Sequence, residues 1–392
     1  MKFLPASIVH GIMSQARLTA VLIAALAMAG CQSFGPGTIQ RDRLDYAGAI
    51  ADSWKELTLL NIVRLRYFDT PTFLDVASVI SSYQLQGEVR FGTEIFPNAA
   101  ADTNRIFGAT GTYSDRPTIS YTPLAGQKFV DSLLRPIPPQ AVFAMIVAGH
   151  QADFIFQSTV RAINDVYNYS GSPSRARRED VAFSQVTAAL RRIQQAGALG
   201  MRIERRTNPR EFSGPGRRDE GTAGRRIEQW VEAEETWLFF REGIDERTAE
   251  DIRFLKQALG IRSDAREVRL VFGSLRRHED EIALLTRSIM EILVELSASV
   301  EVPASHVAEG RARPSADPAV QPGRRQDSIV RIRSGGEPPQ DAYVSVRYRN
   351  QWFWIDDRDL GSKRVFTFLR IFSSIAETGV APQMPVLTIP AN

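Results

Sequence analysis

The densest group of reactive side chains is an acidic run near the C-terminal end of the chain, Asp356-Asp357-Arg358-Asp359. Carboxylates this close together can bind calcium, or can share the acid and base roles of a hydrolase. The regular spacing of an EF-hand loop is absent, however. The competing interpretation is structural, because carboxylates at the start of a helix accept hydrogen bonds from free backbone N–H groups and favour the helix dipole. A helical pattern follows the run, so the structural interpretation is the favoured one.

Trp352 and Trp354 lie just before the acidic run, on a predicted strand that covers residues 351–355. Successive side chains of a strand point to opposite faces, so both tryptophans share one face and Phe353 lies on the other. One of these faces is a candidate binding surface, and core packing is the simpler alternative. The candidate binding surface comprises Trp352, Trp354, Asp356, Asp357 and Asp359.

Recognisable metal and catalytic motifs are missing from the sequence. Three histidines follow residue 30, namely His150, His278 and His306, and they lie far apart. There is no HExxH motif and no Cys/His cluster, so we predict no metal site. The GxSxG, SxxK and P-loop patterns are absent as well, which counts against the common serine hydrolases and nucleotide-binding enzymes. We therefore expect no cofactor and favour a protein that is not an enzyme.

The N-terminal segment is typical of a secretory signal peptide. Residues 1–17 carry Lys2 and Arg17 and no acidic residue, and the apolar run 18–28 follows them. A positive start, an apolar core of about 7–15 residues and small residues at the end are the features of such a peptide. A membrane-spanning helix needs about 20 apolar residues, so this run is too short to be one.

The leader ends in Met28-Ala29-Gly30-Cys31, and Cys31 is the only cysteine of the chain. This ending resembles the lipobox of bacterial lipoproteins, with Met28 where that family prefers leucine. The resemblance implies cleavage before Cys31 and acylation of its sulfur and of its new amine. One acyl chain gives only marginal membrane binding, whereas two or three hold a protein firmly. Gln32 at the next position, in place of aspartate, implies passage to the outer membrane, with the body expected to face the periplasm.

Charge and composition argue against a nucleic-acid partner. The formal charge of the 392-residue chain is +3, and it falls to +1 when Lys2 and Arg17 leave with the leader. A near-neutral protein has no general electrostatic attraction for nucleic acid. The hydrophobic fraction of 43% is sufficient for a folded core, so we expect an ordered body.

The periodicity of apolar residues predicts an α+β fold, with antiparallel strands and hairpins packed with amphipathic helices. Segment 304–327 is rich in proline, arginine and alanine and has no apolar period, which is typical of a linker. We expect a signal peptide at 1–30, a lipidated tether at 31–41, a main domain at 42–303, a disordered linker or loop at 304–327, and a C-terminal hairpin plus helix at 328–392 docked on the main domain.

Single elements follow from the same patterns. Helices are expected from Asp42, from a capping box of Thr248 with Asp251, over 282–296, and after Asp359. Strands are expected at 73–80 and 83–91, a hairpin joins 104–113 to 117–121, and 207–226 is expected to be a loop.

Two functions stay open at this point. The first is a lipid-anchored envelope protein, held by acylated Cys31, that acts as a non-enzymatic scaffold or accessory subunit and binds another envelope protein. The alternative is an envelope hydrolase that uses a carboxylate pair from Asp356–Asp359. Carboxylates clustered in a cleft would favour the hydrolase. An exposed apolar patch beside aspartates that cap a helix would favour the binding protein.

Overall fold

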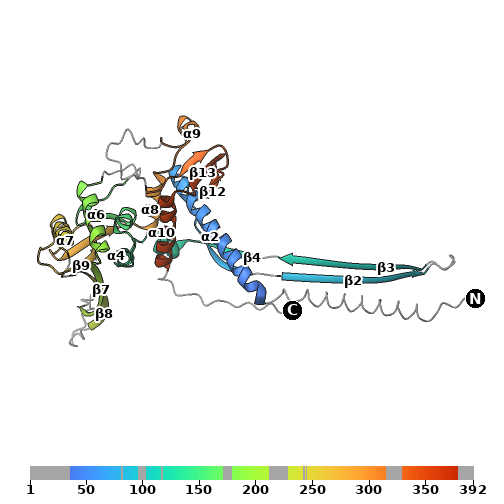
Figure 1. Cartoon of the computed structure of the whole chain (residues 1–392), viewed down its shortest axis with the longest axis horizontal. Coiled ribbons are helices and arrows are strands. Elements are labelled where there is room, and N and C mark those ends of the chain that lie inside the picture. The colour runs from blue at the N-terminus through green and yellow to red at the C-terminus, as the bar shows by residue number, and fades with distance from the viewer. Residues whose placement is uncertain are drawn as a thin grey trace, which may run out of the picture. The chain divides into compact units, whose positions relative to one another are not determined.

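The computed structural model of the chain describes residues 36–80, 83–95, 103–115, 118–170, 179–211, 228–241, 243, 245–314 and 329–377. Within them, helices are combined with sheets whose neighbouring strands are mostly antiparallel, which confirms the predicted α+β class (Figure 1). The chain divides into two compact units, Met1–Glu56 and Leu57–Asn392. None of the helices in this described part is both long and apolar enough to cross a membrane.

Helix α2 (Pro36–Arg66) begins earlier than the sequence pattern predicts. Residues 36–41 belong to this helix, and Asp42 is not its first residue. Proline is favoured at the first helical position because its fixed φ suits the helix and its missing N–H has no partner there. The helix ends before Phe68, which has a positive φ of 59°. The last turns of α2 bury three apolar side chains, Leu59, Ile62 and Val63.

Two nested strand pairs occupy residues 74–123. Strand β1 (Leu74–Ile80) pairs with β4 (Thr118–Pro123), and β2 (Tyr83–Ile95) pairs with β3 (Thr103–Asp115), both antiparallel (Figure 1). The predicted hairpin between 104–113 and 117–121 is therefore wrong. Residues 104–113 pair with β2 and residues 118–121 pair with β1, so each segment pairs with a strand that comes earlier in the chain.

A six-stranded sheet with the order β6-β5-β10-β9-β8-β7 belongs to the second unit. Its strands are β5 (Val160–Ile163), β6 (Val166–Tyr167), β7 (Leu199–Glu211), β8 (Glu228–Phe240), β9 (Glu267–Phe272) and β10 (Glu281–Thr286). All neighbouring strands are antiparallel except β9 and β10, which are parallel. Residues 207–211 continue β7 and are strand, in contrast to the predicted loop.

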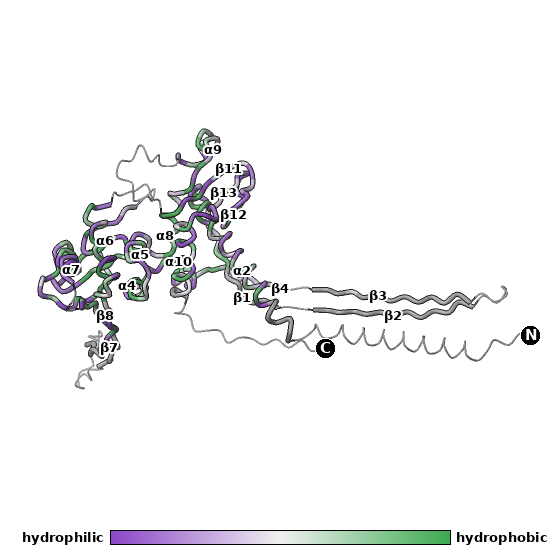
Figure 2. The backbone as a smooth tube through the Cα atoms, in the orientation of Figure 1, coloured by the Kyte–Doolittle hydropathy of each residue, from purple (hydrophilic) through white to green (hydrophobic). Residues whose placement is uncertain are grey.

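The described part of the chain also contains several shorter helices. They are α3 (Gly126–Phe129), the π-helical turn η2 (Val130–Leu134), α4 (Pro139–Val147), α5 (Ala152–Thr159), α6 (Val181–Gln195), α7 (Glu246–Ala258), α8 (Ile289–Ser297) and α9 (Ala304–Ala308). Helices α4, α5, α6 and α7 pack in succession, each against the next. Figure 2 shows hydrophobic and hydrophilic residues along these helices, as amphipathic helices require. Their buried faces supply large core side chains, among them Phe143, Phe156 and Phe183.

The helix predicted over 282–296 is wrong in its first half. Residues 281–286 form strand β10, and the helix begins only at Ile289. Ser288 sets this boundary, because its Oγ accepts from the N–H of Glu291 at 3.2 Å while the Glu291 carboxylate accepts from the N–H of Ser288 at 3.1 Å. This reciprocal pair is a capping box. Helix α7 is capped similarly by Asp245, which accepts from the Thr248 N–H, and not by the predicted Thr248.

The expected linker at 304–327 is structured at its start. Residues 304–308 form α9, and the chain is described up to residue 314, while 315–327 lie outside the described residues. His306 is buried although its neighbours in the sequence are polar or small. Its burial depends on a partner far away in the chain, which composition does not reveal.

A three-stranded sheet follows, in the order β11-β13-β12. Strands β11 (Arg333–Gly335) and β12 (Ala342–Tyr348) both pair antiparallel with β13 (Gln351–Asp356). Between β12 and β13, Arg349 and Asn350 have positive φ values of 49° and 62°, as a type I′ hairpin turn requires.

Helix α10 (Leu360–Glu377) ends the described chain. It contacts both η2 and α8, so only part of its contact is with the predicted 282–296 segment. Phe366 and Phe372 are buried, at 0% and 2% exposure. The sequence PVLTIP at 385–390 also suggests an edge strand, and this segment lies outside the described residues.

Candidate functional site

The two tryptophans of β13 lie on the solvent side of the C-terminal sheet. Phe353 and Ile355 are fully buried, whereas Trp352 and Trp354 are half-buried, as the alternation predicts. The register sets Trp352 opposite Arg347 of β12, and Trp354 opposite Arg333 of β11. Residues directly opposite each other share a face of the sheet. We call the four residues Trp352, Trp354, Arg333 and Arg347 the tryptophan face.

The ring of Trp354 is held close against the neighbouring strand. A Cβ atom at Gly335 would lie 3.2 Å from the Trp354 ring, so a glycine is needed for this contact without adjustment. Both arginines of the tryptophan face are exposed. Tryptophan and arginine are the residue types most enriched among the anchors of protein–protein interfaces. The arrangement is therefore suited to binding a protein surface.

The acidic run serves the start of α10. Asp359 accepts from the N–H of Ser362 at 3.1 Å and from its hydroxyl at 2.7 Å. Asp356 accepts from the N–H of Arg358 at 2.9 Å and lies 3.6 Å from Arg333. Asp357 pairs with Lys363 at 2.7 Å. The three carboxylates thus have separate structural partners, in agreement with the helix-start interpretation. No group of three His, Cys, Asp or Glu residues is placed to hold a metal within the part of the chain that the structure describes.

A second group of polar side chains lies where α2, α9 and the β12–β13 turn meet. The Tyr67 hydroxyl is 2.7 Å from Nδ1 of His306, and the Tyr348 hydroxyl donates to the Asp69 carboxylate. Arg349 donates to the same carboxylate at 2.8 Å and lies 5.3 Å from the centre of the Tyr67 ring. We call Tyr67, Asp69, His306, Tyr348 and Arg349 the Tyr67 cluster.

Burial shifts the pKa values of two members of the Tyr67 cluster, Tyr67 and His306. It raises the pKa of Tyr67 above its usual value, although nearby arginines lower it. It also lowers the pKa of His306, and the positive charges of Arg311 and Arg349 act in the same direction. Near neutral pH the tyrosine therefore keeps its proton and the histidine stays neutral. A neutral histidine that carries its proton on Nε2 accepts from the tyrosine hydroxyl at Nδ1.

The Tyr67 cluster was not predictable from sequence motifs. Tyr67 and His306 are 239 residues apart, and Tyr348 and Asp69 are 279 apart. The one available signal was the aromatic and charged sequence Tyr348-Arg349 at a tight turn. The cluster holds the end of α2 against the sheet that carries the tryptophan face.

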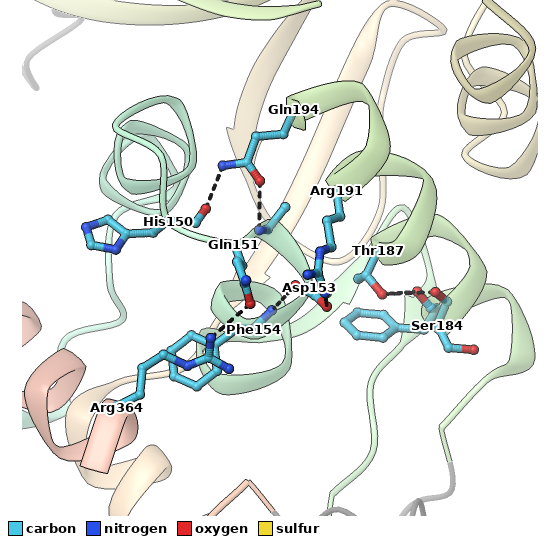
Figure 3. Close-up of polar contacts among 11 residues, drawn as sticks. His150, Gln151, Asp153, Phe154, Ser184, Thr187, Arg191, Gln194 and Arg364 are labelled. Carbon is cyan, nitrogen blue, oxygen red and sulfur yellow. Dashed lines mark hydrogen bonds and ion pairs between the residues drawn. The ribbon is translucent and has the colours of Figure 1, made fainter. Parts of the chain in front are cut away.

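The other two histidines, His150 and His278, lie in separate parts of the structure. The backbone carbonyl of His150 accepts from Gln194 (Figure 3). The ring of His150 meets the Phe368 ring edge-on, at 4.9 Å between centres. His278 lines a polar pocket beside the β5–β6 turn. The structure therefore does not bring the three histidines together. Cys31 lies outside the described residues.

Comparison of the chain with protein-family models, with curated proteins and with solved structures finds no match.

Proposed function

We propose that this chain is a bacterial envelope lipoprotein, anchored to the outer membrane through acylated Cys31, whose body binds another envelope protein as a scaffold or accessory subunit. The lipobox-like ending Met28-Ala29-Gly30-Cys31 supports the anchor. The tryptophan face is the observation that carries the binding role. Two half-buried indoles between exposed arginines can desolvate a partner surface and pair with its carboxylates.

Helix α2 connects the proposed anchor to the rest of the body. Only residues 32–35 separate Cys31 from the start of the helix, and four residues span at most about 14 Å. The 31 residues of α2 then extend over about 46 Å at 1.5 Å per residue. At the far end, Tyr67 and Asp69 bind His306, Tyr348 and Arg349. Helix α2 therefore lies, along the chain, between the proposed anchor and the residues of the Tyr67 cluster.

The hydrolase alternative is less well supported. Its candidate carboxylates, Asp356, Asp357 and Asp359, bind an arginine, a lysine and a helix start, respectively. A catalytic carboxylate pair needs both groups directed at a common substrate position. The separate partners of these aspartates favour the binding protein.

The binding role is tested by the size of the native complex. We expect the detergent-extracted protein to migrate with a partner in native electrophoresis, and Trp354→Ala and Trp352→Ala each to shift it towards the free form. Phe272→Ala is the matched control, because Phe272 is an apolar side chain exposed to 55% outside the tryptophan face. A complex that survives both tryptophan substitutions, or a wild-type protein that migrates alone, would overturn the proposal.

The anchor has an independent test. Mass spectrometry of the native protein should find the chain beginning at Cys31 with acyl groups attached. Cys31→Ser should leave an uncleaved precursor or release the body from the membrane. A mature chain without acyl mass on Cys31 would refute the anchor while leaving the tryptophan face to be judged by its own experiment.

A further inference from the structure

A polar pocket of about 540 Å³ opens beside the turn between β5 and β6 of the six-stranded sheet. One wall is the Asn164-Asp165 turn between β5 and β6, and the other is the loop 275–279 between β9 and β10. This pocket lies outside the tryptophan face and the Tyr67 cluster. Its inference goes beyond the proposed function and does not depend on it.

The first wall is rigid because both the amide nitrogen and the amide oxygen of the Asn164 side chain form hydrogen bonds. Its side-chain N–H₂ donates to the carbonyls of Leu259 at 2.8 Å and Glu281 at 3.2 Å, and its side-chain oxygen accepts from Ala283 at 2.7 Å. Both Asn164 and Asp165 have positive φ, at 45° and 66°. The N–H of Asp165 donates to the carbonyl of Ser274 at 2.8 Å and ties this wall to the other.

The second wall is fixed by a buried carboxylate. Glu281 is 1% exposed and accepts from the backbone N–H groups of Arg277 at 2.8 Å and His278 at 3.2 Å. It also accepts from the Arg269 guanidinium. Burial opposes the ionisation of Glu281, but these hydrogen bonds prevail and its pKa is lowered. The loop is therefore held in one conformation by a charged, fully bonded group.

Arg276 is the lining residue whose side chain is available to bind a ligand in this pocket. It is half-buried and lies over Gly260, where an added Cβ atom would overlap its Nη2. Its guanidinium makes no hydrogen bond or ion pair to any residue that the structure describes. A cation that has lost part of its hydration without gaining a counter-ion favours the binding of an anion.

The pocket also contains carboxylates. Asp165 and Glu279 line it together with Arg276, Arg277 and His278. Groups of both signs around one small cavity suit a ligand of both signs. We infer that this pocket binds a small zwitterion, with its phosphate or carboxylate on Arg276 and its ammonium group on Asp165. A phosphoethanolamine group has this chemistry, either free or as the headgroup of a lipid.

The test is a calorimetric titration of the full chain in nonionic detergent with O-phosphoethanolamine and, separately, with inorganic phosphate. We expect saturable binding of both. Arg276→Gln should weaken both by about tenfold or more, which corresponds to the loss of about 1.4 kcal/mol. Arg276→Lys should restore most of the affinity, since it keeps the cation. Arg253→Gln is the control, an exposed arginine of α7 paired with Glu246, and should change neither.

Asp165→Asn separates the two halves of the inference. Asparagine tolerates a positive φ, so the turn is preserved while the charge is lost. We expect weaker binding of O-phosphoethanolamine and unchanged binding of phosphate. An equal effect on both probes, or none, would overturn the zwitterion assignment. No saturable binding, or full binding by Arg276→Gln, would overturn the site.

A third titration distinguishes the two sources of the ligand. Short-chain phosphatidylethanolamine should bind more tightly than O-phosphoethanolamine if the site reads a lipid headgroup, because Leu275 on the rim is 66% exposed and can contact the acyl chains. Equal affinity assigns the site to a free zwitterion. In both cases Arg276→Gln should weaken binding, because the variant loses the cation that pairs with the phosphate group.

Discussion

At the scale of single residues, the side-chain amide of Gln194 connects helices α4 and α5. Gln194 of α6 donates to the carbonyl of His150 at 2.7 Å (Figure 3). It also donates to the carbonyl of Ile146 at 2.6 Å and accepts from the N–H of Ala152 at 3.0 Å. These groups lie at the end of α4 and the start of α5, where helix ends leave backbone groups without intrahelical partners, and the Ile146 carbonyl also accepts from the N–H of Gly149 at 3.0 Å. Gln194 therefore positions α5, and with it Phe154, against α10.

Gln194→Ala should lower the free energy of unfolding by about 2–3 kcal/mol, because it leaves backbone groups without partners in a partly buried place. Gln195 is the natural control, since it is exposed and next to Gln194 in the same helix. Gln195→Ala should change stability by less than about 0.5 kcal/mol. Chemical denaturation of both variants gives the comparison, and equal effects would contradict the role of the Gln194 amide.

His306 gives the body a dependence on pH. Its pKa in the folded protein is below its ordinary value of 6.5, mainly because it is buried. The unfolded chain therefore takes up the proton first as the pH falls. The contribution of neutral His306 to stability is complete above about pH 6.5 and is lost as the pH falls from there through the lowered pKa.

We expect the free energy of unfolding to fall as the pH drops below about 6.5, and His306→Gln to reduce this slope. Glutamine does not titrate, and its side-chain oxygen can still accept from the Tyr67 hydroxyl. The measurement is denaturant unfolding at several pH values. His278→Gln serves as the control, because His278 is exposed. A slope that His306→Gln leaves unchanged would contradict the assignment.

At the scale of elements, the acidic run shows how neighbouring carboxylates differ. Asp359 holds both the N–H and the hydroxyl of Ser362, whose side chain is buried and in turn accepts from the N–H of Arg331 at 2.9 Å. Asp357 only pairs with Lys363 at the surface. Helix caps contribute far more to stability than exposed ion pairs do.

Asp359→Ala should therefore destabilise the protein by about 0.5–2 kcal/mol. Asp357→Ala should cost less than about 1 kcal/mol, as is usual for an exposed ion pair. Thermal unfolding of the two variants is the measurement. The reverse order of effects would contradict the assignment of Asp359 as the cap of α10.

The elements also show what the sequence could and could not predict. Alternation placed Trp352 and Trp354 opposite to Phe353, and the cap at Asp359 was predictable, because both patterns act within a few residues. The predicted helix over 282–296 failed because apolar residues spaced by three or four also suit a buried strand followed by a helix. The capping box of Ser288 with Glu291 is the local signal that marks the true start of the helix.

Tertiary contacts explain the remaining differences. The composition of 304–327 indicates a linker, yet α9 is fixed by the pairing of His306 with Tyr67. Likewise, Asn164, Asp165 and Arg276 meet only because β5 and β10 are neighbours in the sheet. Patterns within one segment carry no information on such distant partners.

At the scale of the whole molecule, the C-terminal part belongs to the packing of the second unit. Phe368 of α10 is 6% exposed and lies 4.8 Å from the Phe154 ring and 4.9 Å from the His150 ring. Arg364 covers the Phe154 ring at 4.1 Å and donates to Gln151 at 2.9 Å (Figure 3). Removing this part would expose the apolar surface that it covers.

Phe368→Ala should cost about 3–5 kcal/mol of stability, the usual effect of truncating a buried phenylalanine. Thr367→Ala, at the exposed neighbouring position, should have little effect. A chain that ends at Ala304 should aggregate or fail to fold. If that shortened chain were soluble and melted like the full chain, the C-terminal part would be an independent module.

The central claim is that a membrane-anchored body presents the tryptophan face to another envelope protein. Its most direct test is a photoreactive amino acid placed at position 354 in living cells, with the exposed position 253 of α7 as the control. The proposal predicts one dominant adduct with an envelope protein from position 354, none from position 253, and loss of the adduct when Cys31→Ala prevents anchoring. Equal adducts from both positions, or none from position 354, would contradict it.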